Sequence, residues 1–171
     1  MTSAFTVRPA RIDDAAAIAL VHATSWRETY RGTLVSDSVL DAPTFLPDRE
    51  LFWTRALTEE RWAHMRVAVS VHQGEITGIA MSGPSDPDAA SQHLFVLYAL
   101  ARHHGDGSGT ALLHAVTRHD EDTTLWVGDP NPRAQAFYRK HGFVPDGTVT
   151  VEDGIREIRM LRAASARGTS A

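Results

Sequence analysis

The sequence of 171 residues contains no cysteine. This absence excludes disulfide bonds, zinc sites built on thiolates and a covalent acyl-cysteine intermediate. No stretch approaches the roughly 18 consecutive apolar residues that would span a membrane. The first residues, Met1 to Arg11, are mixed and polar, without an apolar run of signal-peptide length. We therefore expect a cytoplasmic protein that does not act at a membrane.

An excess of basic residues is also missing. The chain has 17 Lys and Arg against 21 Asp and Glu, a formal charge of -4 with its nine histidines neutral. Non-specific binding to nucleic acid needs a basic face, so this balance argues against it and leaves room for a cationic substrate. The length and the 43% of hydrophobic residues predict one domain over 1–162. The small and polar residues 163–171 are expected to form a disordered tail.

The patterns of apolar residues predict a mixed sheet with helices on both faces. Asp13 and Asp14 are expected to cap a first long helix, and Pro47 to open another. The run 94–100 is continuously apolar, as in a strand buried on both faces. Two hairpins are expected to turn at Gln73-Gly74 and at Asp153-Gly154. The expected strands are 5–8, 66–72, 75–82, 94–100, 123–127, 148–152 and 155–161, with a helix after the glycines near 107 and another over 131–140.

A glycine-rich turn, Gly105-Asp106-Gly107-Ser108-Gly109, separates the apolar strand from the helix that follows. Glycines allow the backbone to approach a phosphate, and a helix N-terminus offers free N–H groups to it. A dinucleotide fingerprint fails, because the sixth residue counted from Gly105 is Thr110 and not glycine. A nucleotide loop of the Gly-Lys-Ser/Thr type is absent. A simple tight turn stays open as the other interpretation of this segment.

A second motif follows about one strand-helix-strand unit later, in the stretch from Asn131 to Phe143. Asn131, Ala134, the pair Phe137-Tyr138 and the pair Gly142-Phe143 stand there at fixed spacing. Together with Gly107 and Gly109, these residues resemble the paired motifs of the GNAT superfamily of N-acetyltransferases, in order and in register. The resemblance implies an α/β (α+β) fold: a mixed, mostly antiparallel, V-shaped sheet of six or seven strands with helices on both faces.

The resemblance also implies that acetyl-CoA is the acyl donor and that no metal is needed. Backbone groups of Leu97, Tyr98 and Ala99 are expected to pair with the pantetheine arm as a strand would. The loop after them is expected to bind the pyrophosphate, and Asn131 to bond near the pantetheine. His104 stands where the family has Arg or Gln, so this position contributes a donor without a fixed charge. The expected cofactor-binding residues are Leu97, Tyr98, Ala99, His104, Gly105, Asp106, Gly107, Ser108, Gly109, Thr110, Asn131, Ala134 and Phe137.

For the chemistry, the family resemblance implies that the amine attacks the thioester directly. Tyr138 matches the general acid, because a phenol of pKa about 10 is protonated at pH 7 and can donate to the leaving thiolate. The N–H of Ala99 is the implied oxyanion donor. His93 stands where several members carry a glutamate base, and an imidazole can accept the proton of the amine. A packed aromatic and a strand-edge histidine are the alternative interpretations of Tyr138 and His93. Trp126 stands at a second family position for the base and cannot serve; Glu28, Asp129 and Glu152 are fallback carboxylates.

The acceptor is expected to be a small-molecule amine that lies near Trp26 and Tyr30, aromatic residues that can stack on it or face a cation. A role for these side chains, and for Trp53, in the core is the alternative. The residues Ser25 to Gly32 resemble a segment common in uncharacterised bacterial members. The loop 83–91 is a candidate cover for the site. The histidines at 103, 104, 114 and 119 lack the spacing of metal ligands.

Three rival functions remain open at this point. They are a non-catalytic sensor of acyl-CoA, an acetyltransferase of proteins or peptides, and a purely structural interaction domain. A homodimer is the usual arrangement of the family.

Overall fold

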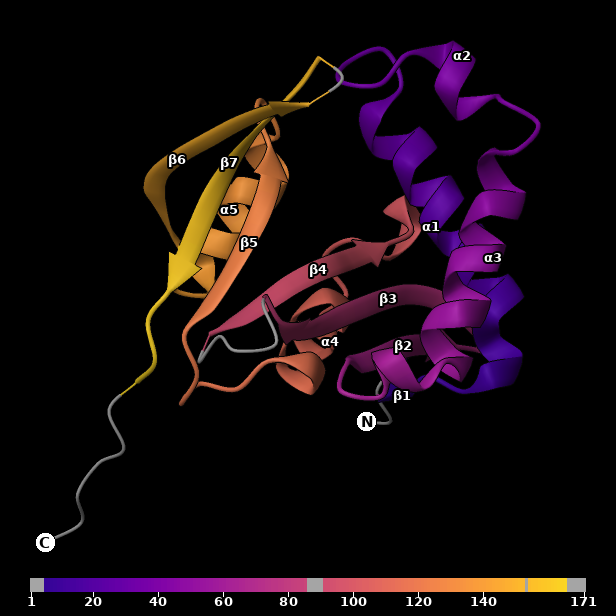
Figure 1. Ribbon diagram of the computed structural model, residues 1–171, viewed down its shortest axis with the longest axis horizontal. Helices are drawn as coiled ribbons and strands as arrows, with labels where there is room; N and C mark the ends of the chain where they lie inside the picture. The colour runs from indigo at the N-terminus through magenta and orange to yellow at the C-terminus, as the bar shows by residue number, and fades with distance from the viewer. Residues whose placement is uncertain (1–4, 86–90, 153, 166–171) are drawn as a thin grey trace, which may run out of the picture. The chain divides into compact units, whose positions relative to one another are not determined.

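The structure, a computed structural model, describes residues 5–85, 91–152 and 154–165. The strand order of its seven-stranded sheet is β1-β2-β3-β4-β5-β7-β6 (Figure 1). The pairing of β4 with β5 is parallel, whereas β1–β2, β2–β3, β5–β7 and β6–β7 are antiparallel. This confirms the predicted mixed, mostly antiparallel sheet. The strands are β1 (Thr6–Pro9), β2 (Arg66–His72), β3 (Glu75–Pro84), β4 (Gln92–Ala99), β5 (Thr123–Gly128), β6 (Val144–Glu152) and β7 (Ile155–Arg162).

The chain divides into two compact units, which we describe separately. Unit 1 comprises Met1–Ser82 and Val96–Val116, and unit 2 comprises Gly83–Phe95 and Thr117–Ala171. The α-helices of unit 1 are α1 (Ala15–Tyr30), α2 (Asp37–Leu40), α3 (Phe45–Thr58) and α4 (Ser108–Val116); α5 (Pro132–Lys140) belongs to unit 2. Short 3-10 turns occupy Ile12–Asp14, Glu60–Trp62 and Ala101–His103. The single domain over residues 1–162 stays a prediction.

In unit 1, successive side chains of β2 and β3 point to opposite faces of the sheet, and different helices cover the two faces. Val69 and Ile79 are fully buried and belong to the core that α1 and α3 cover, together with Ile18 and Trp53. The opposite face lies against α4. A Cβ added to Gly78 on that face would approach Leu112 Cδ1 of α4 to 2.9 Å, so α4 packs closely only because this position lacks a side chain.

The hairpin between β2 and β3 forms as predicted. Both turn residues have positive φ, 50° for Gln73 and 86° for Gly74. This is the left-handed backbone that a two-residue turn of this twist requires. The register pairs His72 with Glu75, so the predicted bounds of the first arm are confirmed.

Three local predictions were wrong. Helix α3 begins at Phe45 and not at Pro47, because proline is tolerated within a first turn whose N–H groups have no helical partner. Asp14 does not cap α1 with its side chain, because a 3-10 turn precedes the helix and the carboxylate bonds Arg8 and the N–H of Arg11 instead. Strand β4 is not buried on both faces, since 42% of Phe95 is exposed.

Unit 2 contains β5 with the hairpin of β6 and β7, and α5. The side chain of Asn131 accepts from the N–H of Ala134 at 3.2 Å, and Pro132 follows it as the first helical residue. Phe143 is fully buried beneath the guanidinium of Arg162, 4.9 Å from the ring centre. The pairing of β6 and β7 around position 154 is confirmed, although Asp153 lies outside the described residues. Of the predicted tail, Ala164 donates its N–H to Asp122 and Ser165 donates to the carbonyl of His119, both at 2.6 Å.

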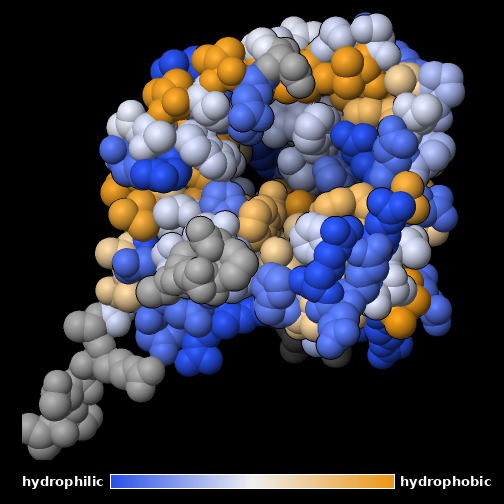
Figure 2. Space-filling model, viewed as in Figure 1, coloured by the Kyte–Doolittle hydropathy of each residue, from blue (hydrophilic) through white to orange (hydrophobic). Residues whose placement is uncertain are grey.

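Hydrophobic and hydrophilic residues are interspersed over the face seen in Figure 2. The exposed large hydrophobic side chains come from different elements, for example Leu20 of α1, Leu51 of α3 and Val151 of β6. Among the described residues, no helix combines the length and the apolar character needed to cross a membrane.

Candidate functional site

The glycine loop of unit 1 offers unused backbone donors. Gly105 and Gly107 have φ of 88° and 95°, the left-handed region that favours glycine. The N–H groups of Gly105, Gly107 and Gly109 make no hydrogen bond to any described residue, and the buried hydroxyl of Ser108 has no partner there either. The N–H groups between them are used, by Asp106 to the carbonyl of His103 and by Ser108 to the carboxylate of Asp106, so the free donors stand at alternate residues. Free N–H groups of a turn at a helix N-terminus can bind an anion. The loop therefore fits the pyrophosphate that the resemblance places there.

Asp106 supplies a negative charge to the same loop. Its carboxylate accepts from the N–H of Ser108 at 2.8 Å and lies 3.3 Å from Nδ1 of His103. Burial opposes ionisation of Asp106, but the hydrogen bonds from Ser108 and His103 outweigh it and hold the pKa of the carboxyl below its ordinary value. The carboxylate thus caps α4 in the place where an anionic ligand would compete for the N–H of Ser108.

His104, the departure from the family pattern, turns back toward the preceding strand. Its Nε2 lies 2.9 Å from the carbonyl of Ala99 and must carry the proton of this hydrogen bond, since a carbonyl only accepts. The side chain therefore fixes the start of the loop to the end of β4. Arg102, two residues earlier in the chain, pairs with Glu75 at 3.6 Å.

The end of β4 carries the backbone groups expected to bind pantetheine. The pairing with β5 covers Gln92–Leu94, before Leu97, Tyr98 and Ala99 are reached. The N–H of Leu100 donates to the carbonyl of Thr77 at 3.0 Å, so the strand end is held to β3. Glu28 of α1, one of the fallback carboxylates, accepts from the N–H of Ala101 at 2.8 Å. The carboxylate of Glu28 thus lies against Ala101, which is two residues after Ala99 in the chain.

The predicted acceptor residues Trp26 and Tyr30 meet edge to face, 5.2 Å between ring centres. They belong to a cluster that α1, α3 and the end of β4 contribute, and we call it the aromatic cluster. Trp53 is fully buried and serves the core, as the alternative interpretation of it held. The members of the cluster are His22, Trp26, Tyr30, Phe45, Trp53 and Tyr98.

His22 connects the core side of this cluster to β4. Its ring stacks on Tyr98 at 5.2 Å, and its Nδ1 accepts from Nε1 of Trp53 at 3.1 Å. Burial, together with the positive charge of Arg49, lowers the pKa of His22 to about 3. The imidazole is therefore neutral at pH 7, with its proton on Nε2.

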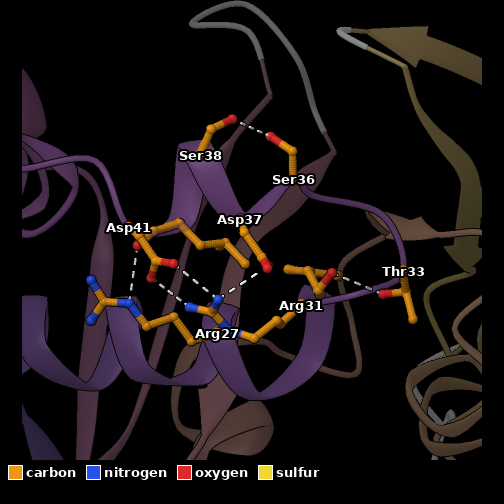
Figure 3. Close-up of polar contacts among 9 residues, drawn as sticks. Arg27, Arg31, Thr33, Ser36, Asp37, Ser38 and Asp41 are labelled. Atoms are coloured by element: carbon orange, nitrogen blue, oxygen red, sulfur yellow. Dashed lines mark hydrogen bonds and ion pairs between the residues drawn. The ribbon is translucent and has the colours of Figure 1, made fainter.

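The guanidinium groups of Arg27 and Arg49 both lie near the ring of Phe45 in the aromatic cluster, but they contact different groups. Arg49 lies 3.4 Å from the centre of the Phe45 ring and 4.7 Å from that of Trp26. Arg27 lies 5.2 Å from Phe45 and donates from Nε to the carbonyl of Leu40. Figure 3 shows how Arg27 and its neighbour Arg31 point to α2, where Arg31 pairs with Asp41 and Asp37. The sequence analysis did not identify Arg49, because nothing in the local pattern connects it with Trp26.

In unit 2, His93 is held by a hydrogen bond from its ring. Nδ1 lies 2.8 Å from Oγ1 of Thr124, whose hydroxyl in turn donates to the carbonyl of Gln92 at 3.4 Å. This arrangement assigns the proton to Nδ1 and leaves the lone pair of Nε2 as the acceptor. Burial and, after it, the charge of Arg159 lower the pKa of His93, so the ring is neutral at pH 7 and offers the lone pair of Nε2, although it is a weaker base than an exposed imidazole.

The second motif forms a packed end of α5. Tyr138 is 8% exposed and its ring meets Phe137 at 5.4 Å and Phe143 at 5.8 Å, edge to face in both cases. Ala134 receives the cap of Asn131, whose side-chain nitrogen makes no hydrogen bond to a described residue. This amide is therefore able to donate to a ligand, while its oxygen stabilises the helix.

The other fallback carboxylates of unit 2 do not replace His93. Asp129 is paired with Arg156 at 2.9 Å and also accepts from Gln135, a buried side chain that the sequence analysis missed. Glu152 lies at the end of β6 and acts on Glu157, whose pKa is raised by burial and by that neighbouring charge. Within the described ranges, no group of three or more His, Asp or Glu side chains is placed to hold a metal ion.

Comparison with known proteins identifies the family. The model of the acetyltransferase (GNAT) domain matches residues 47–163, more than half of the chain. The chain therefore belongs to the GNAT acetyltransferase family, and the resemblance carried by Gly107, Gly109 and the motif 131–143 is confirmed.

Among curated relatives, the uncharacterized N-acetyltransferase Rv2669 of Mycobacterium tuberculosis is 37% identical over 103 residues. The match spans 57% of this chain and 63% of that relative, so the chain covers less than two thirds of its length. The uncharacterized N-acetyltransferase YuaI of Bacillus subtilis is 28% identical over 143 residues, 80% of this chain and 78% of the relative.

Solved structures share the fold over nearly the whole chain. The PaiA N-acetyltransferase of Thermoplasma acidophilum, in complex with coenzyme A, has a TM-score of 0.74 at 16% identity and covers 93% of this chain and 98% of its own. The structure of yncA from Salmonella typhimurium with its cofactor acetyl-CoA has a TM-score of 0.68 at 18% identity, with 98% of both chains covered. At these identities the likeness shows the fold alone.

Proposed function

We propose that the protein transfers the acetyl group of acetyl-CoA to a primary amine of a small molecule. Membership of the GNAT family supports the activity, and the loop before α4 supports the donor. The observation that carries the proposal is the set of three glycine N–H groups, at Gly105, Gly107 and Gly109, without a partner among the described residues. They suit an anionic group such as the pyrophosphate of coenzyme A.

Acetyl-CoA supplies the activated acetyl group as a thioester. Nε2 of His93 takes the proton of the attacking ammonium, directly or through water, so that the nitrogen lone pair can form the new C–N bond. The N–H of Ala99 donates to the carbonyl oxygen as negative charge develops on it. The hydroxyl of Tyr138 gives its proton to sulfur as the C–S bond breaks. The nitrogen loses its second proton as the intermediate collapses, and this proton restores the phenol of Tyr138 through water. The products are the amide and the free thiol of coenzyme A.

Two rival functions are weighed against this proposal. A non-catalytic sensor of acyl-CoA needs the glycine loop, but it gives no reason for a neutral His93 whose Nε2 makes no hydrogen bond to a described residue. An acetyltransferase of proteins or peptides needs an extended surface that accepts a chain. The adjacent rings of Trp26 and Tyr30 suit stacking on a small acceptor or contact with its cation. A homodimer, the usual arrangement of the family, and a location in the cytoplasm are part of the same proposal.

The test is a free-thiol release assay with acetyl-CoA across amines, amino acids, polyamines and aminoglycosides, beside a calorimetric titration of acetyl-CoA. The proposal predicts binding of acetyl-CoA and thiol release that depends on the amine. Binding without release from any small amine, but with release from peptides, would favour the protein acetyltransferase. Binding without any release would favour the sensor.

A further inference from the structure

Arg49 is half-buried and makes no hydrogen bond or ion pair with a carboxylate of the described residues, although the charge of its neighbour Asp48 acts on it. Among the described residues, it makes one hydrogen bond, from Nη1 to the carbonyl of Phe45 at 2.8 Å. Its Nε is buried and has no hydrogen-bond partner in the part of the chain that the structure describes. Arg8 and Arg31, by contrast, lie within 2.7 Å and 2.5 Å of Asp14 and Asp41. Arg49 thus differs from Arg8 and Arg31 in that it is not paired with a carboxylate.

The rings around Arg49 explain only part of this arrangement. Phe45 and Trp26 face the guanidinium and attract it through their π electrons. An aromatic face does not accept the in-plane N–H groups of the guanidinium fork. Arginine remains charged at neutral pH even though burial lowers the pKa of Arg49. A charge taken partly out of water needs an opposite charge with hydrogen bonds to be stabilised.

The position of Arg49 points to the acceptor side of the reaction. Its charge acts on Tyr98 and on His22, which stack on each other. Tyr98 immediately precedes Ala99, the implied oxyanion donor. Trp26 and Tyr30, the residues expected near the acceptor, belong to the same aromatic cluster of unit 1. An anion bound by Arg49 is therefore in the neighbourhood where the acceptor is expected.

We propose that the acceptor amine also carries a carboxylate, as an amino acid or a close analogue does, and that Arg49 binds this carboxylate. The inference rests on the proposed acetyl transfer and narrows its substrate class. One guanidinium balances one negative charge, and its planar fork matches a carboxylate in two parallel hydrogen bonds. The apolar rings of Phe45 and Trp26 beside the guanidinium suit a singly charged group better than a doubly charged phosphate, whose desolvation costs more.

The first experiment compares matched amines with the unmodified protein. Thiol release is measured with a panel of amino acids, with the corresponding amino acid amides, and with the corresponding aminophosphonic acids. The amides keep the shape and lose the negative charge. We expect kcat/KM for the acids to exceed that for the amides at least tenfold, the effect of losing a hydrogen bond to a charged group.

The second experiment uses Arg49→Met, which keeps the stem over Phe45 and Trp26 and removes the charge. We expect the preference for acids over amides to disappear, and Arg49→Lys to restore part of it. Arg55→Met is the matched control: Arg55 belongs to the same helix, is exposed, and lies 3.7 Å from Glu59. It should leave the preference unchanged. Titration with an N-acetylated amino acid in the presence of coenzyme A gives a binding readout that does not depend on turnover.

The outcomes separate the two proposals. Equal turnover of acids and amides, or a preference for phosphonic acids, would overturn the inference and leave the acetyl transfer standing. Thiol release from no amine of either series would overturn the proposed function, and the inference with it. Should Arg49→Met fail to fold, the comparison of acids with amides on the unmodified protein still decides.

Discussion

Burial of His22 makes the stability of unit 1 depend on pH. The folded protein holds this imidazole neutral, with a pKa of about 3, whereas the unfolded chain protonates it below about 6.5. Because the unfolded state binds the proton first, the stabilisation is fully present above pH 6.5 and is lost as the pH falls toward 3. At pH 5 this residue alone should cost about 2 kcal/mol of the free energy of unfolding.

Urea denaturation at pH 7.5 and pH 5.0 checks this prediction, with His22→Gln as the comparison. Glutamine still offers an acceptor to Nε1 of Trp53 and does not titrate. We expect the variant to lose less stability than the unmodified protein between the two pH values. Equal losses would contradict the assignment of a neutral, buried imidazole.

Tyr138 carries the prediction that concerns chemistry most directly. Tyr138→Phe removes the hydroxyl and keeps the ring that packs on Phe143. If the phenol protonates the leaving thiolate, kcat should fall by roughly 10²–10⁴-fold while the affinity for acetyl-CoA is retained. Steady-state kinetics and calorimetry measure the two quantities. An unchanged kcat would assign Tyr138 to packing alone.

At the scale of elements, the loop before α4 combines an anion site with an anionic side chain. Asp106→Asn keeps an acceptor for the N–H of Ser108 and removes the negative charge. We expect tighter binding of acetyl-CoA, by severalfold, because a charge near the pyrophosphate is gone. Asp120→Asn, which removes a carboxylate paired with Arg118 in unit 2, is the control of equal charge. Weaker binding after Asp106→Asn would show that the cap matters more than the charge.

The packing of α4 on the sheet depends on Gly78 of β3. A Cβ there would lie 2.6 Å from Oγ of Ser70 and 3.0 Å from the carbonyl of Tyr98, so Gly78→Ala forces these neighbours apart. We expect a loss of about 1–3 kcal/mol of stability in chemical denaturation. The double variant Ser70→Ala/Gly78→Ala relieves the shortest contact and should recover part of the loss. A neutral Gly78→Ala would contradict the close approach of α4.

The elements that the sequence predicted best have local causes. The turn at Gln73-Gly74 follows from the backbone preferences of the residues themselves. The cap at Asn131 has an equally local cause but was not predicted. The start of α3 at Phe45 was missed because Pro47 suits both the first residue and the first turn of a helix. The surroundings of Arg49 could not be predicted, because they join helices whose contacting residues, Trp26 and Arg49, are far apart in the chain.

For the whole molecule, the paired motifs predicted the family and a mixed sheet of six or seven strands. Both are confirmed, and the sheet has seven strands. Roles of single residues are a different matter. The roles of Tyr138, His93 and the glycine loop in the reaction stay predictions. The contacts within each unit leave these groups in the chemical state that the roles need. The acceptor was not predictable, because its recognition depends on side chains that only the folded chain brings together.

The most direct test of the account follows the acetyl group itself. The protein is incubated with acetyl-CoA labelled in the acetyl group and with the amine that releases most thiol, and the products are separated and identified by mass spectrometry. The account predicts the label in an amide bond on the amine, in an amount equal to the thiol released. Label found as free acetate, with the amine unchanged, would contradict it.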